Sequence, residues 1–380
     1  MTDANAKSPP HFRFFDNREK YLLFVTTCGE KWAIAERLGR ELDLIAPTPP
    51  ALRAFDAGMG DATVLNRALR DLHRHFPTVP FLVVGKEVSL EDVRLSLEKM
   101  ADRFFEHPQM VLAVTNMNYA EAPALRPRKP EDRARMNWWA VPLEGNTAHD
   151  FDRQIRALQP RLAEGWQTRT SARTGNPLYV VPSVILLYRA DRRFVLDRVI
   201  PTPAGVDDGY DLVIASQPFR ARQPAETKVR NVLAPLARAL APGGRMVVVQ
   251  ATGRDPGMEI INRIWPDEDP FQTPGHELIT TLESALGRDI PDLRFVGPVD
   301  EGSLFRYHLH ALPDEIGSNI GTSTLLAAWN AAVYVAQISD DRLTGALEAG
   351  AYLEATRAVL QRHGGLWFLD ESFVAYRKRG

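Results

Sequence analysis

Short apolar segments alternate along this chain with longer segments whose apolar side chains recur at helical spacing. The apolar runs are residues 52–55, 80–85 and 110–115, and the helical spacing covers residues 62–75 and 90–105. Consecutive parallel strands need a crossover connection, usually a helix, so this alternation favours a parallel sheet. The chain is therefore predicted to fold as an α/β protein.

The alternation returns in the second half of the chain. Strands are expected at residues 210–215 and 246–250, separated by a helix over 226–240. Repeated units of this kind predict a doubly wound, mostly parallel sheet with helices on both faces. The last third of the chain adds expected helices over residues 277–286, 325–338 and 352–363 and a closing strand near 373–376.

The regular pattern does not cover the whole chain. Residues 1–50 are expected to form an N-terminal helical segment that ends at the proline-rich stretch 46–50. Between residues 124 and 208 the pattern loosens, and this part is interpreted as an insertion or cap subdomain. The core then comprises residues 51–123 and 209–380, including C-terminal helical additions.

Charge and cysteine content exclude several classes of partner. The 46 Lys and Arg residues against 48 Asp and Glu residues leave a net charge of −2, so no nucleic-acid partner is expected. The single cysteine, Cys28, cannot form an internal disulfide and is expected to be a buried, unreactive thiol. Residues 1–10 lack the apolar core of a signal peptide, and no run reaches the roughly 18 apolar residues that span a bilayer. A cytoplasmic protein without membrane association is predicted.

A glycine-rich turn follows the first expected strand and opens a helix. It reads Phe-Asp-Ala-Gly-Met-Gly-Asp-Ala over residues 55–62, and glycines at such a turn let a ligand approach the backbone. The dinucleotide fingerprint would need a third glycine where this chain has Thr63, and no Gly-Lys-Ser/Thr follows for a phosphate-binding loop. Asp56, directly before the turn, suits a ligand that carries an ammonium group and a sulfonium. S-adenosylmethionine (SAM) is such a ligand.

At this turn the chain resembles the class I, Rossmann-like family of SAM-dependent methyltransferases. Residues 211–219 look like the fourth strand of that family and the loop after it, and residues 240–249 look like the turn into its fifth strand. The resemblance covers residues 52–115 and 210–250. It implies a Rossmann-like core, SAM as cofactor and a small-molecule methyl acceptor.

The resemblance also implies which residues hold the cofactor. An acid after the second strand would accept hydrogen bonds from both ribose hydroxyls, and Glu87 is that acid, with Glu91 and Asp92 as alternatives. Asn116 and Asn118 lie where the family contacts adenine, although capping a loop is their alternative role. The predicted cofactor-binding set is Asp56, Gly58, Gly60, Asp61, Glu87, Asn116 and Met117.

The acceptor is expected beyond the fourth strand. Residues 216–219 (Ser-Gln-Pro-Phe) are similar to a polar-Pro-Pro-aromatic loop of methyltransferases that act on amino groups, which implies catalytic roles for Ser216 and Gln217. A plain strand-terminal turn is the alternative. The predicted acceptor-binding residues are Phe219, Trp138, Trp139 and Tyr119. The basic run 126–129 is either a solvated loop or a contact for an acidic substrate.

Two other functions remain open. An NAD-dependent oxidoreductase would explain the alternation of strands and helices but not Asp56 or Thr63, and a binding protein with a methyltransferase-like fold needs no catalysis. His308 and His310 alternate on an expected strand, but two histidines are too few for a metal site, so no metal is predicted. The oligomeric state is open, with a homodimer as one option.

Overall fold

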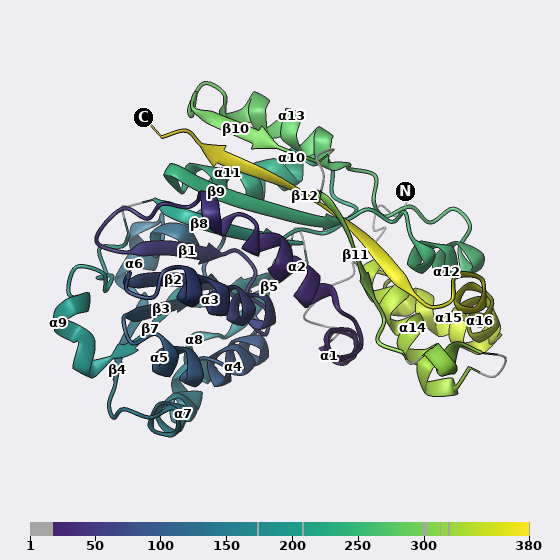
Figure 1. Cartoon of the computed structure of the whole chain (residues 1–380), viewed down its shortest axis with the longest axis horizontal. Coiled ribbons are helices and arrows are strands. Elements are labelled where there is room, and N and C mark those ends of the chain that lie inside the picture. Colours follow the sequence, from purple (N-terminus) through teal and green to yellow (C-terminus); the bar gives the residue numbers. More distant parts are fainter. Residues whose placement is uncertain are drawn as a thin grey trace, which may run out of the picture.

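The computed structural model of the chain describes residues 18–172, 175–206, 209–298, 302–311, 313–317 and 320–379, so the polar segment 1–10 lies outside it. A ten-stranded sheet forms its centre, in the order β10-β12-β9-β8-β1-β2-β3-β7-β4, with β11 paired to β12 outside this path (Figure 1). The strands of this sheet are β1 (Leu52–Asp56), β2 (Phe81–Lys86), β3 (Met110–Thr115), β4 (Asn137–Leu143), β7 (Ser183–Arg189), β8 (Tyr210–Ser216), β9 (Leu240–Ala251), β10 (Leu293–Val296), β11 (Leu304–His308) and β12 (Trp367–Arg377).

The middle of the sheet is parallel, as predicted. Strands β3, β2, β1, β8 and β9 pair in parallel, with Phe55 of β1 opposite Val84 of β2 and Val213 of β8. The two flanks depart from this direction, because β7 pairs antiparallel with β3, and β12 lies antiparallel between β9 and β10. The parallel strands therefore end at one edge of the sheet.

Helices cover both faces of the sheet, which confirms the predicted fold class. Alternate residues of β3 enter different cores: Met110 and Leu112 pack with α3, α4, α5, α7 and α8, whereas Val111 and Ala113 pack with α11 and α13. Such two-residue alternation is the property of a strand buried on both faces. These helices are α3 (Thr63–His75), α4 (Leu90–Glu98), α5 (Ala101–Glu106), α7 (Ala148–Arg156), α8 (Gln159–Gly165), α11 (Ala234–Arg238) and α13 (Gly275–Leu286).

The segment between residues 124 and 208 extends the sheet more than it covers it. Strands β7 and β4 lengthen the sheet beyond β3, and α7 and α8 pack beside α5 and α4. The hairpin of β5 (Thr168–Thr170) and β6 (Pro177–Tyr179) pairs outside the main sheet. The segment also contains the short helices α6 (Pro130–Ala134) and α9 (Arg193–Leu196).

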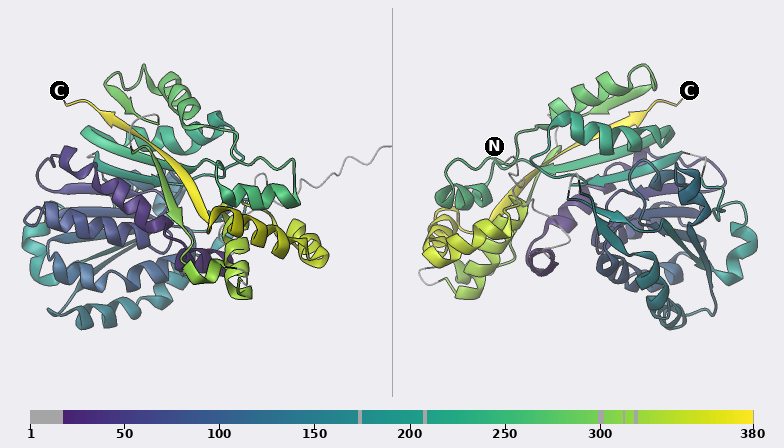
Figure 2. Two further views of the ribbon diagram at one scale, coloured as in Figure 1. Left: turned by 45° about the vertical axis from the view of Figure 1, so that its right-hand side comes forward. Right: turned by 180° about the vertical axis from the view of Figure 1, so that it is seen from behind.

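The C-terminal helices form a third core beside the sheet. Phe24 and Trp329 are buried in it together with Phe368, the start of β12. The N-terminal helix α1 packs on α14 in this unit, whereas α2 packs on α3, so the expected N-terminal helical segment contains two helices with different neighbours (Figure 2). The helices concerned are α1 (Arg18–Thr27), α2 (Glu30–Gly39), α12 (Pro256–Ile264), α14 (Thr322–Val335), α15 (Asp340–Ala349) and α16 (Ala351–His363). Among the described residues, no helix has the length and apolar character to cross a bilayer.

Candidate functional site

A cleft of about 1360 Å³ lies where the parallel strands end. Its lining includes Asp56 from β1, Lys86 from β2 and Ser216 from β8, each at the carboxyl end of its strand. Ligands of open α/β sheets bind at this edge. Pockets for one small molecule usually measure about 300–1,000 Å³, so this cleft has room for two ligands side by side.

Asp56 lies buried behind the glycine turn. Its Oδ1 accepts a hydrogen bond from the Gly58 amide at 3.2 Å. Burial, with a contribution from nearby Glu87, raises the pKa of Asp56 to about 7, although Gly58 and Lys31 oppose the shift. With a pKa near neutral pH, the Asp56 carboxyl group would ionise when a cationic ligand binds beside it.

Gly58 faces open space, in contrast to its neighbour Gly60. A Cβ built on Gly58 would meet no atom within 4 Å, although the residue lines the cleft. A Cβ on Gly60, whose φ is +52°, would lie 2.9 Å from the Tyr21 hydroxyl. The backbone at Gly58 is thus the part of the turn that a ligand can approach.

Glu87 connects the second strand to the glycine turn. Its Oε2 accepts the Gly60 amide at 3.0 Å, and its Oε1 accepts the amides of Val88 and Ser89 at 2.7 and 2.9 Å. From the other side, the Trp166 indole donates to the Glu87 carbonyl oxygen at 2.8 Å. The carboxylate is fixed at the cleft wall, with lone-pair capacity left for a further donor.

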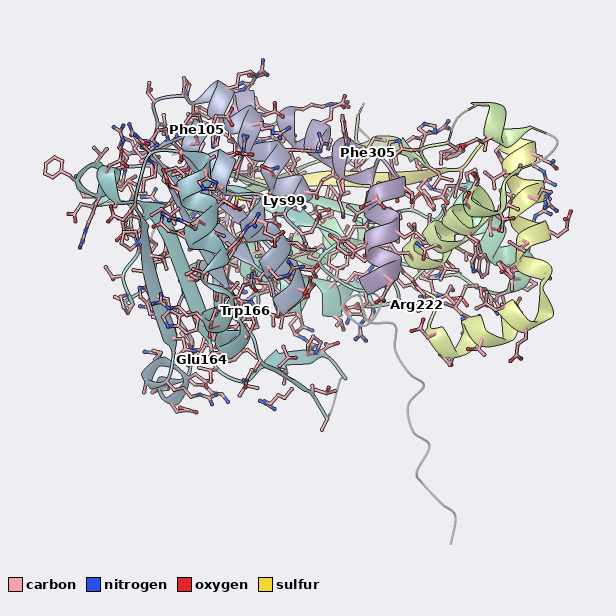
Figure 3. The ribbon with its side chains drawn as sticks, turned by 90° about the horizontal axis from the view of Figure 1, so that it is seen from below. Lys99, Phe105, Glu164, Trp166, Arg222 and Phe305 are labelled. Carbon is pink, nitrogen blue, oxygen red and sulfur yellow. The ribbon has the colours of Figure 1, made fainter. Side chains whose placement is uncertain are left out.

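Asp61 lines the same cleft, but protein groups already engage its carboxylate. Lys99, Thr63 and Tyr21 all donate to it, and Figure 3 labels Lys99 among the helices that cover the sheet. Burial alone would raise the pKa of Asp61, but Lys99 and the two hydroxyls outweigh it and lower the pKa. Its main visible role is to fix the start of α3.

Asn116 does not present its amide group to a ligand. Both hydrogens of Nδ2 are donated within the protein, to the carbonyls of Gly165 and Val181 at 2.8 and 2.9 Å, and Oδ1 accepts the Ser183 amide at 2.9 Å. The side chain therefore ties β3 to β7, which favours the structural alternative over the expected contact with adenine. Met117, next in the chain, is buried and also lines the cleft.

Tyr119 joins two loops that are far apart in sequence. Its hydroxyl donates to the carbonyl oxygen of Pro218 at 2.9 Å, and the Lys86 ammonium lies 4.6 Å from its ring centroid. The loop after β8 and the segment after β3 therefore border the same cleft, as the topology predicts. Burial raises the pKa of Tyr119, so the hydroxyl stays protonated and acts as a donor.

Gln217 is held by two buried carboxyl groups. Its Nε2 donates to Glu30 at 2.8 Å and to Asp370 at 3.4 Å, and its φ of +46° places the residue in the left-handed region. Burial and the neighbouring Glu30 raise the pKa of Asp370 well above its ordinary value. Since the Glu30 carboxylate can only accept, the amide nitrogen must face it, and Oε1 remains as the acceptor of this side chain.

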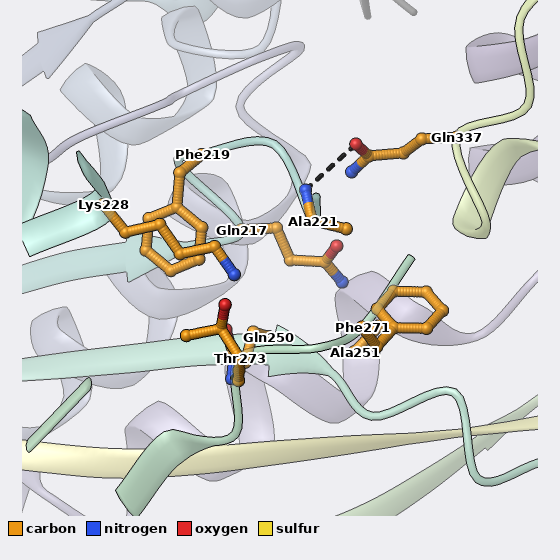
Figure 4. Close-up of a pocket in the computed structure, with 9 residues that line it drawn as sticks. All are labelled: Gln217, Phe219, Ala221, Lys228, Gln250, Ala251, Phe271, Thr273 and Gln337. Atoms are coloured by element: carbon orange, nitrogen blue, oxygen red, sulfur yellow. Dashed lines mark hydrogen bonds between the residues drawn. The ribbon is translucent and has the colours of Figure 1, made fainter. Parts of the chain in front are cut away.

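A small cavity adjoins the cleft behind Gln217 (Figure 4). Its volume of about 10 Å³ suits one water molecule, and Phe219 lines it with the Lys228 ammonium 4.9 Å from the ring centroid. Burial lowers the pKa of Lys228 to about 8. Phe219 is also part of the cleft lining, but most of its ring is buried.

The two tryptophans expected to bind the acceptor lie elsewhere. Trp138 and Trp139 belong to the edge strand β4, where each packs partly buried on a different face of the sheet, and neither lines the cleft. A Cβ on Gly165 would lie 2.7 Å from the Trp139 ring. The ring therefore packs against the end of α8. Because β4 joins the sheet instead of covering the cleft, the structure gives no support to their expected role in acceptor binding.

Sequence reasoning missed a group of cleft residues from the helical segments. Tyr21 of α1 and Tyr334 of α14 lie with ring centroids 6.0 Å apart, although they are 313 residues apart in the chain. Lys31 pairs with Glu30 at 2.7 Å, and the attraction of Glu30 outweighs burial and raises the pKa of Lys31. The only signal was the charged pair at the start of an otherwise amphipathic helix.

Other residues singled out in the sequence have plain structural surroundings. Cys28 is buried, and burial raises the pKa of its thiol to about 12, which agrees with the predicted unreactive thiol. His308 and His310 are exposed. Within the described ranges, no group of three or more His, Cys, Asp or Glu side chains is arranged to hold a metal ion.

No protein-family model matches the chain. No curated protein matches it in sequence either. Solved structures that it resembles include the [4+2]-cyclase SpnF, at 12% identity over 90% of this chain and 82% of that chain, with a TM-score of 0.36. A protein described as a sarcosine dimethylglycine methyltransferase of Galdieria sulphuraria shows 9% identity over 95% and 86%, with a TM-score of 0.34. A SAM-dependent methyltransferase of Geobacter sulfurreducens in complex with S-adenosylhomocysteine shows 11% identity over 91% and 90%, with a TM-score of 0.29. At these TM-scores, function has to be inferred from the residues of the cleft.

Proposed function

We propose that this protein is a SAM-dependent methyltransferase that acts on a small-molecule acceptor at a nitrogen atom. The observation that carries the proposal is the glycine turn after β1, where carboxyl groups lie around an open approach to the backbone. Asp56 lies behind Gly58, and Glu87 accepts the Gly60 amide. These residues fit a ligand with cationic groups and a ribose diol.

The same turn disfavours a dinucleotide. A pyrophosphate at such a site needs the free amides of the glycine turn and the helix start, together with the positive end of the helix dipole. Here the Gly60 amide donates to Glu87 and the Thr63 amide donates to Asp61 at 3.2 Å. Two carboxylates occupy the place of the phosphates and would repel them.

Lys31 and Asp56 together fit an amino-acid group. Lys31 lines the cleft and lies close enough to Asp56 to oppose the rise in the pKa of that carboxyl group. An amino acid carries an ammonium group, which would pair with Asp56, and a carboxylate, which would pair with Lys31. We therefore assign the methionine end of SAM to the space between these two side chains.

The chemistry requires orientation more than acid–base groups. Bound SAM supplies an activated methyl group on a sulfonium, and direct displacement forms the bond from nitrogen to carbon while the electron pair of the broken bond stays on sulfur. Holding reactants in line can lower the barrier by roughly 7–11 kcal/mol. Gln217 Oε1 is placed to accept a hydrogen bond from an amine, since its amide nitrogen is held by Glu30. Ser216, at the end of β8, is the second proposed contact.

Calorimetric titration of the purified chain with SAM, S-adenosylhomocysteine and NAD⁺ tests the assignment of cofactor. We expect one site for each of the first two ligands and no binding of NAD⁺. Binding of NAD⁺ in place of SAM would establish the oxidoreductase instead. A chain that binds SAM but transfers no methyl group to any amine in a mixed panel, followed with methyl-labelled SAM, would be the non-catalytic binding protein.

A further inference from the structure

The charged residues that line the cleft are segregated by sign along the sequence. Among the described lining residues up to position 92, six are acidic and two are basic, and we call this part the acidic wall. From position 121 to 238, seven are basic and three are acidic, and we call this part the basic wall. The whole chain has a net charge of only −2, so the segregation is a property of the cleft and not of the composition.

Three segments that are distant in sequence build the basic wall. Arg128 and Lys129 precede α6, Arg169 lies on β5, and Arg230 lies on the helical segment after β8. Two hydrogen bonds hold these segments together: Tyr179 donates to Glu121 at 2.9 Å, and Arg220 donates to Asn176 at 2.6 Å. The cations therefore come from different segments that these hydrogen bonds hold together beside one cleft.

Several of these cations have no anionic partner. Arg128, Lys129 and Arg169 are exposed and line the cleft, and their charged side-chain groups form no ion pair or hydrogen bond with any residue in the described part of the chain. By contrast, Arg135 and Arg238 pair with Asp132 and Asp289. Unpaired like charges around one space repel one another, and a bound anion relieves that repulsion.

We infer that the basic wall binds the methyl acceptor and that this acceptor is a small molecule carrying a phosphate group. The inference rests on the proposed function, which assigns the acidic wall to SAM and leaves the second half of the cleft to the acceptor. Six of the seven cations are arginines, whose planar guanidinium groups match phosphate oxygens in pairs.

The three unpaired cations, Arg128, Lys129 and Arg169, favour a phosphate over a single carboxylate. A phosphate group carries about two negative charges and three acceptor oxygens, so that it can be contacted from three sides at once. A carboxylate offers one charge and two oxygens. A long polyanion is less favoured, because the cations line a cleft and the chain as a whole does not attract nucleic acid.

The test measures binding of inorganic phosphate and pyrophosphate to the full chain, by phosphorus NMR and calorimetry, with and without S-adenosylhomocysteine. We expect one pyrophosphate site whose occupancy S-adenosylhomocysteine does not reduce. The double variant Arg128→Gln/Arg169→Gln should weaken pyrophosphate binding at least about tenfold, because two charge-assisted contacts are lost. The control Arg161→Gln/Arg198→Gln removes the same charge from exposed positions outside the cleft and should leave binding unchanged.

The outcomes separate this inference from the proposed function. Binding of SAM without any pyrophosphate site, or an equal loss in both double variants, overturns the inference alone. If pyrophosphate binds and SAM does not, the anion site is supported but the proposed methyltransferase function is contradicted. Competition between pyrophosphate and S-adenosylhomocysteine would place the anion on the acidic wall and contradict the inference. If single-stranded RNA binds more tightly than pyrophosphate and its affinity falls steeply with salt, the acceptor is a polyanion, and the inference of a small acceptor is contradicted.

Discussion

The Glu87 carboxylate accepts the Gly60 amide hydrogen at 3.0 Å, which fixes the end of β2 against the turn after β1. This one contact brings together the acid and the glycines that the sequence separates by 27 residues. The position of the carboxylate is therefore set before any ligand arrives. A ligand that lies along the turn meets an acceptor whose geometry needs no rearrangement.

Replacing Glu87 by Ala should weaken SAM binding by about 1.5–3 kcal/mol, since a charge-assisted hydrogen bond to the ribose is lost. Calorimetry on the variant measures the change in Kd. Glu91→Ala is the control, because Glu91 also lines the cleft but engages Arg94. If Glu91→Ala weakens SAM binding and Glu87→Ala does not, Glu91 and not Glu87 contacts the ribose.

Gly58→Val should abolish SAM binding and leave the fold intact. The valine side chain would enter the open space next to the turn, and the backbone of Gly58 is not in the left-handed region. Gly321→Val is a matched control, because a Cβ there also meets no atom within 4 Å. Thermal unfolding and SAM titration of both variants check the expectation, which unchanged affinity in Gly58→Val would falsify.

SAM affinity should rise about tenfold between pH 6 and pH 8. The pKa of Asp56 is about 7 in the free protein, so most of its carboxyl groups are neutral at pH 6 and ionised at pH 8. A cationic ligand binds the ionised form, and its binding releases a proton near pH 7. In Asp56→Asn the affinity should be lower and this part of the pH dependence should vanish, as measured by titration at several pH values.

Asp56 should also lower the stability of the free protein as the pH rises. Its pKa is about 7 in the folded chain against 3.8 for an ordinary aspartate, so between these values the folded state holds a proton that the unfolded state has lost. The free energy of unfolding therefore falls with rising pH, by up to about 4 kcal/mol in total. Asp56→Asn should be more stable than the wild type at pH 8 and equal to it near pH 4. The exposed Asp197→Asn should show no such difference.

Gln217→Ala should reduce turnover with little effect on SAM affinity, because its proposed partner is the acceptor. The variant also leaves Glu30 and Asp370 without their shared donor, so its melting temperature needs to be measured alongside. Gln223→Ala, another glutamine of the cleft lining, is the control. A wild-type rate with a verified acceptor would remove Gln217 from the reaction.

The sequence predicts the core of the fold well, because its strands are buried on both faces. Such strands read as continuous apolar runs, and their carboxyl ends must share one edge of the sheet. This places Asp56, Glu87 and Ser216 together without knowledge of any side-chain contact. The same reasoning puts the loop of Tyr119 beside Pro218, as the structure shows.

The sequence predicts less where a contact depends on distant partners. Asn116 looks like a cleft residue until Gly165 and Val181, some 50 and 65 residues later, take both hydrogens of its amide. Trp138 and Trp139 look like residues of a cap because nothing local reveals that β4 joins the sheet edge. Glu30 and Tyr334 reach the cleft only through helix packing, which periodicity alone does not orient.

The pairing of strand β12 determines when the sheet can be completed as the chain is synthesised. The strand lies between β9 and β10 and also pairs with β11, so residues 367–377 hold one flank of the sheet and the C-terminal helices together. While the chain is being synthesised, β1, β2 and β3 can pair early, but β9 exposes an open edge until the last of these residues has left the exit tunnel. Pairing of β12 with β9 is therefore a late step of folding, and the unpaired edge of β9 favours aggregation until that step is complete.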